Sequence, residues 1–236
     1  RGLGDVYKRQ EQNQKDYREY IESWVHEIKA PITAIALNCE NNRDERSRYL
    51  LVENRKVENY VDMALYYARM DAVYKDYMIA ETNLQEVAQQ VLLQNKYYLI
   101  QSHVKAEVAC PDTVYSDKKW IAFILNQLIQ NSVKYGRSEG THIQIVTKKT
   151  KSGVLLRVKD DGIGIPKEEI PRIFEKGFTG TNGRNRERST GMGLYLCRKL
   201  CDKLNIEIRA ESAEGKGTEI ILMFPVSDYL TGYRET

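Results

Sequence analysis

The segment 158–166, "VKDDGIGIP", decides the fold because it joins a strand pattern to a glycine-rich turn. Alternating apolar residues at 154–160 predict a strand that ends in a pair of carboxylates. Glycine lets the backbone approach a ligand closely and adopt a positive φ, and Asp160 can accept a hydrogen bond from an exocyclic amine. An ordinary hairpin turn is the alternative, because Asp-Gly is a common signal for one.

Two more glycine-rich segments follow and argue against a plain turn. "STGMGLYL" (189–196) opens a predicted helix with a second glycine pair, and the bare N–H groups of a helix N-terminus are a ready phosphate site. "EGKGTEI" (214–220) places glycines before the last predicted strand, where a β-turn is the alternative. The three segments together indicate a nucleotide-binding surface.

An amide and an ammonium group precede these segments on one predicted helix, in "QLIQNSVKY" (127–135). Asn131 and Lys134 lie three residues apart, so they share a helix face, and Tyr135 comes next. An amide oxygen can bind Mg²⁺, a lysine can neutralise phosphate, and an aromatic ring can border a base. Alone the pattern is weak, since Asn and Lys usually form the solvated face of a helix.

The surrounding pattern predicts an α+β sandwich over residues 83–228. Helices are expected at 83–97 and 117–135. The alternating runs "VKAEV", "HIQIVTK", "VLLRVKD", "IEIRAES" and "TEIILMF" predict antiparallel strands. A linker is expected at 73–82 and a C-terminal tail at 229–236.

A helical hairpin is predicted before the sandwich, over residues 15–72. Apolar residues recur at spacings of three and four from Tyr20 to Cys39 and again from Asp44 to Met70, with "NNRD" (41–44) as the turn. Such a hairpin cannot bury both of its stripes alone, so we expect a homodimer whose hairpins form a four-helix bundle. Residues 1–14 fit no element and are expected to be disordered or a sequence-assembly scar.

The first of these helices carries a histidine beside a glutamate and close to a proline, in "SWVHEIKAPIT" (23–33). At about 100° per residue, His26 points roughly 140° away from the apolar stripe. A lone surface histidine is the plainest interpretation. However, Glu27 can orient the ring and take its proton, Pro31 should kink the helix, and Lys29 is expected to be free for a partner or a phosphate.

Composition excludes several classes of protein. A net charge of +3, without a block of Lys and Arg interleaved with aromatics, argues against nucleic-acid binding. The four cysteines form no CxxC pair, so we expect free thiols in a reducing compartment. Without a long apolar run we expect no membrane span and no signal peptide in this chain. A Rossmann fingerprint and a Walker lysine loop are both absent from the sequence.

The order of the motifs closely resembles the ATP-binding domain of sensor histidine kinases, a fold shared with gyrase, Hsp90 and MutL. "VHEIKAPI" resembles the phosphoacceptor segment of the same family. The resemblance implies a bacterial two-component enzyme that uses ATP and Mg²⁺ to phosphorylate its own histidine, His26, with help from Glu27. An aspartate on a response-regulator receiver domain would then take the phosphoryl group.

The resemblance also assigns a nucleotide site. Asn131 would bind Mg²⁺, Lys134 would contact phosphate, Tyr135 would form a pocket wall and Asp160 would read adenine. Further positions carried over with the motifs are Gly162, Gly164, Ile165, Phe178, Gly191, Met192, Gly193, Leu194 and Thr218. The loop 175–190, with Arg184, Arg186 and Arg188, would be a lid over the triphosphate or a solvated charge run.

Three residues depart from the family pattern: Gln127 replaces a common Asn, Ser189 a common Gly, and Ala30 a residue that helps dephosphorylate the partner. The sequence is most similar to kinases of Gram-positive bacteria that sense peptide antibiotics beside an ABC transporter. That likeness implies the cytoplasmic part of a cell-membrane protein, with its membrane segments outside this chain. The alternatives are a gyrase-like or Hsp90-like ATPase clamp and a non-enzymatic dimeric scaffold.

Overall fold

The computed structural model describes residues 2–42, 44–69, 78–181 and 190–226. The chain divides into two compact units, residues 1–77 and residues 78–236, and each is described by itself. The first is helical and the second is a mixed α/β sandwich, as the sequence predicts.

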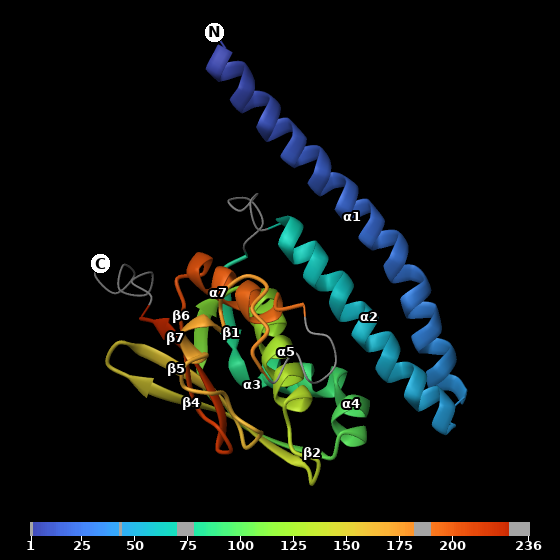
Figure 1. Ribbon diagram of the computed structural model, residues 1–236, viewed down its shortest axis with the longest axis vertical. Helices are drawn as coiled ribbons and strands as arrows, with labels where there is room; N and C mark the ends of the chain where they lie inside the picture. The colour runs from blue at the N-terminus through green and yellow to red at the C-terminus, as the bar shows by residue number, and fades with distance from the viewer. Residues whose placement is uncertain (1, 43, 70–77, 182–189, 227–236) are drawn as a thin grey trace, which may run out of the picture. The chain divides into compact units, whose positions relative to one another are not determined.

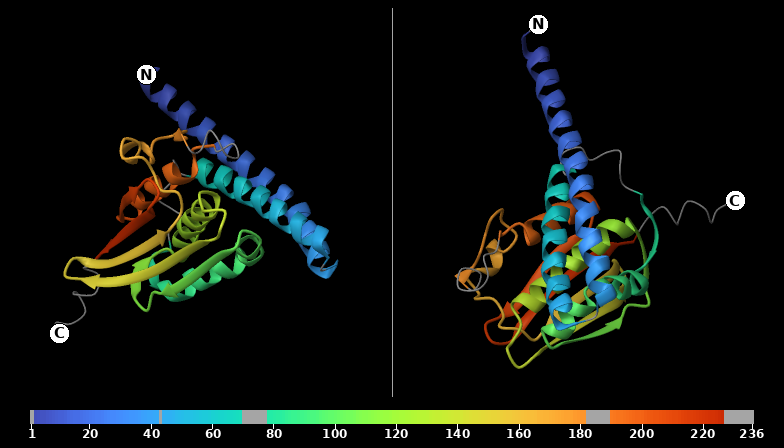
Figure 2. Two further views of the ribbon diagram at one scale, coloured as in Figure 1. Left: turned by 60° about the horizontal axis from the view of Figure 1, so that its bottom comes forward. Right: turned by 90° about the vertical axis from the view of Figure 1, so that its right-hand side faces the viewer.

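The helical unit is a hairpin of α1 (Gly2–Asn42) and α2 (Glu45–Arg69), which run side by side in both views of Figure 2. Asp44 starts α2 by accepting a hydrogen bond from the backbone N–H of Ser47 at 2.6 Å, as an N-cap residue does. The two helices meet through a buried cluster, flanked by Ile21 and Ile28, that consists of Val25, Ile32, Val61 and Leu65.

Helix α1 begins earlier in the chain than the sequence predicts, and it contains Pro31, the proline expected to kink it. The sequence predicted disorder or an assembly scar at residues 1–14, whereas in the structure α1 begins at Gly2. After Gly4 no helix breaker occurs before Pro31, so an established helix can extend through polar residues without an apolar stripe. The helix also continues through Pro31 to Asn42, and it bends in its second half (Figure 1).

The second unit is built on a five-stranded sheet in the order β2-β4-β5-β7-β6. Its strands are β2 (Val104–Ala109), β4 (Thr141–Thr150), β5 (Gly153–Asp160), β6 (Glu207–Ala213) and β7 (Gly217–Pro225). The helices α3 (Leu84–Gln94), α5 (Lys118–Lys134) and α7 (Gly193–Lys203) pack side by side against the sheet (Figure 1). Fully buried side chains from both layers form the core, among them Ile124, Leu125, Ile143, Leu156, Leu196 and Leu222.

The strands are not all antiparallel, so that expectation was wrong for one pair. β2 and β4 run parallel, with Val104 opposite Thr141. Helix α5 lies between them in the chain, and a crossover through a helix returns the chain in the same direction.

The sequence also missed a small sheet and a helix break. β1 (Ala80–Asn83) pairs with β3 (Thr113–Ser116), and β1 begins inside the expected linker. The helix expected at 83–97 ends at Gln94, and α4 (Lys96–Gln101) follows after Asn95. The Asn95 side chain donates to the Val91 carbonyl and to Asn126 Oδ1, both at 2.8 Å, which draws the chain into a new direction.

Candidate nucleotide site and phosphoacceptor helix

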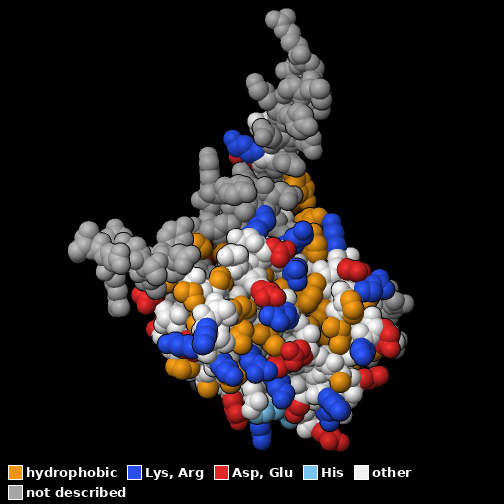
Figure 3. Space-filling model, turned by 90° about the vertical axis from the view of Figure 1, so that its left-hand side faces the viewer, with side chains coloured by type: hydrophobic (Ala, Val, Ile, Leu, Met, Phe, Trp, Pro, Cys, Tyr) orange, Lys and Arg blue, Asp and Glu red, His pale blue; other side chains and the backbone are white. Residues whose placement is uncertain are grey.

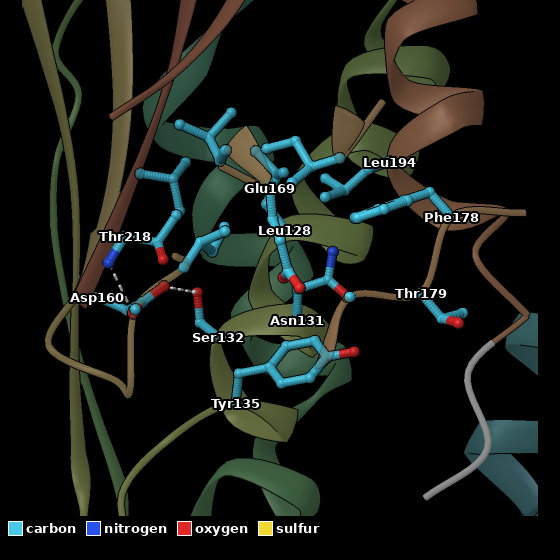
Figure 4. Close-up of a pocket in the computed structure, with 16 residues that line it drawn as sticks. Leu128, Asn131, Ser132, Tyr135, Asp160, Glu169, Phe178, Thr179, Leu194 and Thr218 are labelled. Carbon is cyan, nitrogen blue, oxygen red and sulfur yellow. Dashed lines mark hydrogen bonds between the residues drawn. The ribbon is translucent and has the colours of Figure 1, made fainter. Parts of the chain in front are cut away.

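An open cavity lies between α5, the end of β5 and the loops that follow it (Figure 4). The walls are mostly apolar, with a few polar groups. The lining residues are Leu128, Asn131, Ser132, Tyr135, Val158, Asp160, Gly164, Ile165, Glu169, Ile173, Phe178, Thr179, Gly180, Leu194, Thr218 and Ile220.

Asp160 is the best-anchored polar group of this cavity. Its Oδ1 accepts hydrogen bonds from the N–H groups of Gly162 at 2.9 Å and Thr218 at 3.2 Å. Its Oδ2 accepts a hydrogen bond from the Ser132 hydroxyl at 2.9 Å, and Figure 4 shows the bonds from Ser132 and Thr218. A carboxylate has about four acceptor positions, so these three bonds leave room for one donor from a ligand.

Burial raises the pKa of the Asp160 carboxyl, and the three hydrogen bonds oppose that rise. The hydrogen bond from Gly162 opposes it most, followed by those from Ser132 and Thr218. The chain therefore fixes a partly desolvated acceptor at the wall of an apolar pocket, which suits it to read a hydrogen-bond donor on a flat, apolar ring.

The glycines of the first segment are required by close backbone packing. Gly164 has a φ of 72°, and a Cβ on it would overlap the carbonyl oxygen of Ala213. A Cβ on Gly162 would lie 2.6 Å from the carbonyl oxygen of Tyr135. Any side chain at these positions would push the loop away from α5 or from the β6–β7 turn, and would displace the wall that holds Asp160.

The last turns of α5 place Asn131 and Tyr135 on the cavity wall, whereas Lys134 does not line it. The Lys134 ammonium group lies 5.9 Å from the centroid of the Tyr135 ring. Asn131 is the amide that could bind a metal ion together with phosphate oxygens. Within the described part of the chain, no group of three or more His, Cys, Asp or Glu could hold a metal by itself.

The second glycine segment is only partly at the cavity. Of its predicted site residues, Leu194 lines the cavity, and Gly191, Met192 and Gly193 do not. Gly191 has a φ of 64°, and its carbonyl accepts a hydrogen bond from the N–H of Gly177 at 3.1 Å. A Cβ on Gly193 would lie 2.7 Å from Gln127 Oε1, so α7 begins tightly packed against α5.

Several wall residues were not predicted. Ser132 follows Asn131 directly, and its contact with Asp160 across 28 positions leaves no periodic signal. Glu169 accepts hydrogen bonds from the N–H and hydroxyl of Thr181 at 2.8 and 2.7 Å. Phe178, which was predicted, lies beside Arg172, whose guanidinium group is 4.7 Å from the centroid of the Phe178 ring. Beyond Thr181, the predicted lid arginines and Ser189 fall in 182–189, outside the described residues.

The predicted phosphoacceptor pair lies in the helical unit. Both His26 and Glu27 are exposed on α1, while the preceding Val25 is buried in the hairpin core. The expectation that Lys29 would be free was wrong, because its Nζ pairs with Asp62 of α2 at 2.7 Å.

Surface charge shows no basic face for nucleic acid on the view in Figure 3. Lys and Arg side chains are interspersed there with Asp and Glu. Among the described residues, no helix is both long and apolar enough to cross a bilayer.

Comparison with known proteins agrees with this geometry. Residues 116–228 match the family described as "Histidine kinase-, DNA gyrase B-, and HSP90-like ATPase". The chain is 33% identical to sensor histidine kinase YxdK of Bacillus subtilis over 87% of its length, and 35% identical to sensor protein kinase GraS of Staphylococcus aureus over 90%. It spans 64% and 62% of these two relatives.

Solved structures give the same answer. The catalytic domain of histidine kinase ThkA matches 63% of this chain and 97% of its own length, with 26% identity and a TM-score of 0.55. Full-length ShkA in complex with AMPPNP shares the fold over 88% of this chain and 45% of its own length, with 20% identity and a TM-score of 0.62. Residues 116–228 therefore form a domain of the histidine kinase-, DNA gyrase B- and HSP90-like ATPase family, and the chain is similar to bacterial sensor histidine kinases.

Proposed function

We propose that this chain phosphorylates itself on His26 with ATP and passes the phosphoryl group to an aspartate of a response-regulator receiver domain. The observation that carries the proposal is the presence of two complementary sites in one chain. A preformed acceptor pocket is centred on Asp160, and an exposed His-Glu pair lies on a helical hairpin.

The cavity suits ATP. Asp160 has room for the exocyclic amine of adenine, and Tyr135, Ile165 and Phe178 offer apolar surface to the base and ribose. Asn131 supplies an amide oxygen to Mg²⁺, and the ion would neutralise charge on the triphosphate. Lys134, Gly191, Met192 and Gly193 do not line the cavity, and their contact with the phosphates stays a prediction from the sequence resemblance.

The reaction at His26 is an in-line transfer. The unprotonated imidazole nitrogen attacks the γ-phosphorus, a P–N bond forms, and the P–O bond to ADP breaks. Glu27, next along α1, takes the proton that the other ring nitrogen releases. Exposure of both side chains is what this step needs, because His26 must meet first the nucleotide and then the receiver domain.

Exposed apolar side chains on the same hairpin support a homodimer. Trp24 and Ile35 are 43% and 47% exposed, and Leu50 and Val57 of α2 are 45% and 47% exposed. Helical rotation of about 100° per residue puts Trp24 and Ile35 on the flank of α1 opposite His26. Two hairpins that pack through these residues would make a four-helix bundle and leave both histidines accessible.

The wider assembly follows from the family. Because the relatives are sensor proteins, we infer that the chain is the cytoplasmic part of a membrane-attached receptor. An ABC transporter as a partner stays a prediction from the sequence resemblance. The gyrase-like and Hsp90-like clamp is disfavoured by the exposed His-Glu pair, and the non-enzymatic scaffold by the intact acceptor network at Asp160.

Labelling with γ-labelled ATP tests the proposal. We expect His26→Gln to abolish incorporation and to retain nucleotide binding. His142→Gln is the matched control, because its imidazole pairs with Glu107 on the sheet of the other unit, and it should label like the native chain. Undiminished labelling of His26→Gln would contradict the assignment.

A further inference from the structure

Two ion pairs join α1 to α2 on either side of His26. Arg69 Nε contacts Glu22 Oε1 at 2.8 Å, and Lys29 Nζ contacts Asp62 Oδ1 at 2.7 Å. The two pairs place their charges on opposite helices: the acidic residue lies on α1 in the first pair and on α2 in the second. Only the second pair places a cation on the helix that carries the histidine.

Helix geometry brings this cation near the imidazole. Glu22 and Lys29 are seven residues apart and therefore lie on one flank of α1, and His26 lies between them along the axis. Positions three apart on a helix have Cβ atoms about 5–6 Å apart, so the Lys29 side chain can span from its own position to a group on the His26 ring.

Phosphorylation changes which partner attracts the ammonium group more strongly. A carboxylate carries a single negative charge, whereas a phosphoryl group carries more than one and offers three acceptor oxygens. Lysine is a compact charge on a flexible stem, so it can exchange one anion for another with little rearrangement of the backbone.

Resting on the proposed function, we propose that Lys29 is the counter-cation of phosphorylated His26 and that Asp62 is its partner in the unphosphorylated hairpin. Asp62 is thus a positioning residue, because it acts only through Lys29. By competing for the ammonium group, it lowers the equilibrium yield of the phosphorylated form. Lys29 takes no part in bond making: the P–N bond still forms as the P–O bond to ADP breaks, and the ammonium group supplies charge alone.

A purely structural role is the competing explanation. The side chains of Lys29 and Asp62 are 38% and 27% exposed, so solvent screens the pair, and such pairs contribute only about 0–1 kcal/mol to stability. An ion pair with only this structural role would change the free energy of unfolding slightly, and it would not change the equilibrium between phosphorylated and unphosphorylated His26.

The test measures the ratio of phosphorylated to unphosphorylated His26 in the full chain at a fixed ratio of ATP to ADP with Mg²⁺. We expect Asp62→Asn to raise this ratio about two- to fivefold and Lys29→Met to lower it by a similar factor. In the Lys29→Met background, Asp62→Asn should have no further effect. Both changes should shrink as ionic strength rises.

Glu53→Gln is the matched control. It removes the same charge from the same helix, where Glu53 pairs with Lys56 at 3.0 Å. It lies nine residues before Asp62, which places it on the opposite side of α2. We expect the native ratio from this variant.

Three results would overturn the inference. The first is an unchanged ratio in Asp62→Asn. The second is a change on Asp62→Asn that is as large in the Lys29→Met background as in the native chain, and the third is a change on Glu53→Gln as large as that on Asp62→Asn. Thermal unfolding of each variant separates a loss of hairpin stability from a shift in the phosphorylation equilibrium of His26. If the native chain is never labelled on His26, the proposed function itself is contradicted. Failure of the proposed function is therefore distinguishable from failure of the inference about Lys29 and Asp62.

Discussion

The helical hairpin and the sandwich use their polar groups in opposite ways. In the sandwich, Asp160 is partly desolvated and accepts three hydrogen bonds from within the unit. In the hairpin, His26 and Glu27 are exposed, and the ion pair next to them is open to solvent. A group that recognises one ligand benefits from a fixed position, whereas a group that meets two partners in turn must stay accessible.

Apolar packing shows the same contrast. The sandwich buries side chains such as Leu156 and Leu222 completely between its own layers. The hairpin buries a small cluster around Val25 and leaves Ile35 and Val57 about half exposed. We therefore expect the sandwich to be stable by itself, and we expect the stability of the hairpin to depend on a second copy and so on protein concentration.

The largest effect is expected from Gly164→Ala in the sandwich. The new methyl group would overlap the Ala213 carbonyl at a φ of 72°, so we expect a loss of roughly 3 kcal/mol or more in the free energy of unfolding, together with loss of ATP binding. Gly215→Ala is the control, since Gly215 has a φ of 75° but nothing lies within 4 Å of its Cβ position. It should cost only about 1 kcal/mol. Denaturant unfolding with equal losses for the two variants would show that strain alone, without the overlap, sets the cost.

A smaller effect, confined to the other unit, is expected from Ile32→Ala. Ile32 is 6% exposed in the hairpin cluster, and its truncation should cost about 2–4 kcal/mol at any protein concentration. Ile35→Ala should instead weaken self-association, because Ile35 is exposed in the single hairpin. Circular dichroism and sedimentation at several concentrations would measure both, with ATP affinity unchanged in each. Equal concentration dependence of the two variants would contradict the proposed interface.

How far the sequence predicts the molecule also differs between the units. Strand periods and glycine spacing predicted the five strands of the main sheet, because alternation and tight turns are local properties. The parallel pairing of β2 with β4 was not predicted, since strand direction depends on where a helical crossover returns the chain. The small β1–β3 sheet was missed because four-residue strands carry too little periodicity.

At the candidate sites, the sequence did not predict contacts between residues that lie far apart in the chain. The motifs predicted Asp160, Asn131 and Tyr135, which the fold brings to one cavity. They gave no sign of Glu169 as a wall residue, or of the Lys29–Asp62 pair, whose members lie on different helices. Helical periodicity predicted that His26 faces solvent, but it could not say which anion would pair with the lysine one turn away.

The smallest effect is expected from Ser132→Ala, which removes one hydrogen bond to the charged form of Asp160. Burial already raises the pKa of Asp160 above its ordinary value of 3.8, and losing the hydroxyl should raise that pKa further. Adenine needs the ionised carboxylate as an acceptor, so ATP binding weakens as pH falls through this pKa. We therefore expect the acid limb of ATP binding to move to higher pH in Ser132→Ala. The loss of binding free energy should be about 1 kcal/mol on that limb and smaller at pH values well above the pKa of Asp160.

Asp160→Asn is the control for this profile, because an amide cannot titrate and its weak binding should not vary with pH. The free energy of unfolding depends on pH in the opposite direction to ATP binding. In the interval between 3.8 and its raised pKa, the folded carboxyl binds more protons than the unfolded one, so the free energy of unfolding falls as pH rises through that interval. Asp160→Asn should then unfold at pH 7 no more easily than the native chain. Calorimetric titration of ATP across pH, paired with thermal unfolding, checks both signs; a Ser132→Ala acid limb that coincides with the native one would mean that the hydroxyl does not tune Asp160.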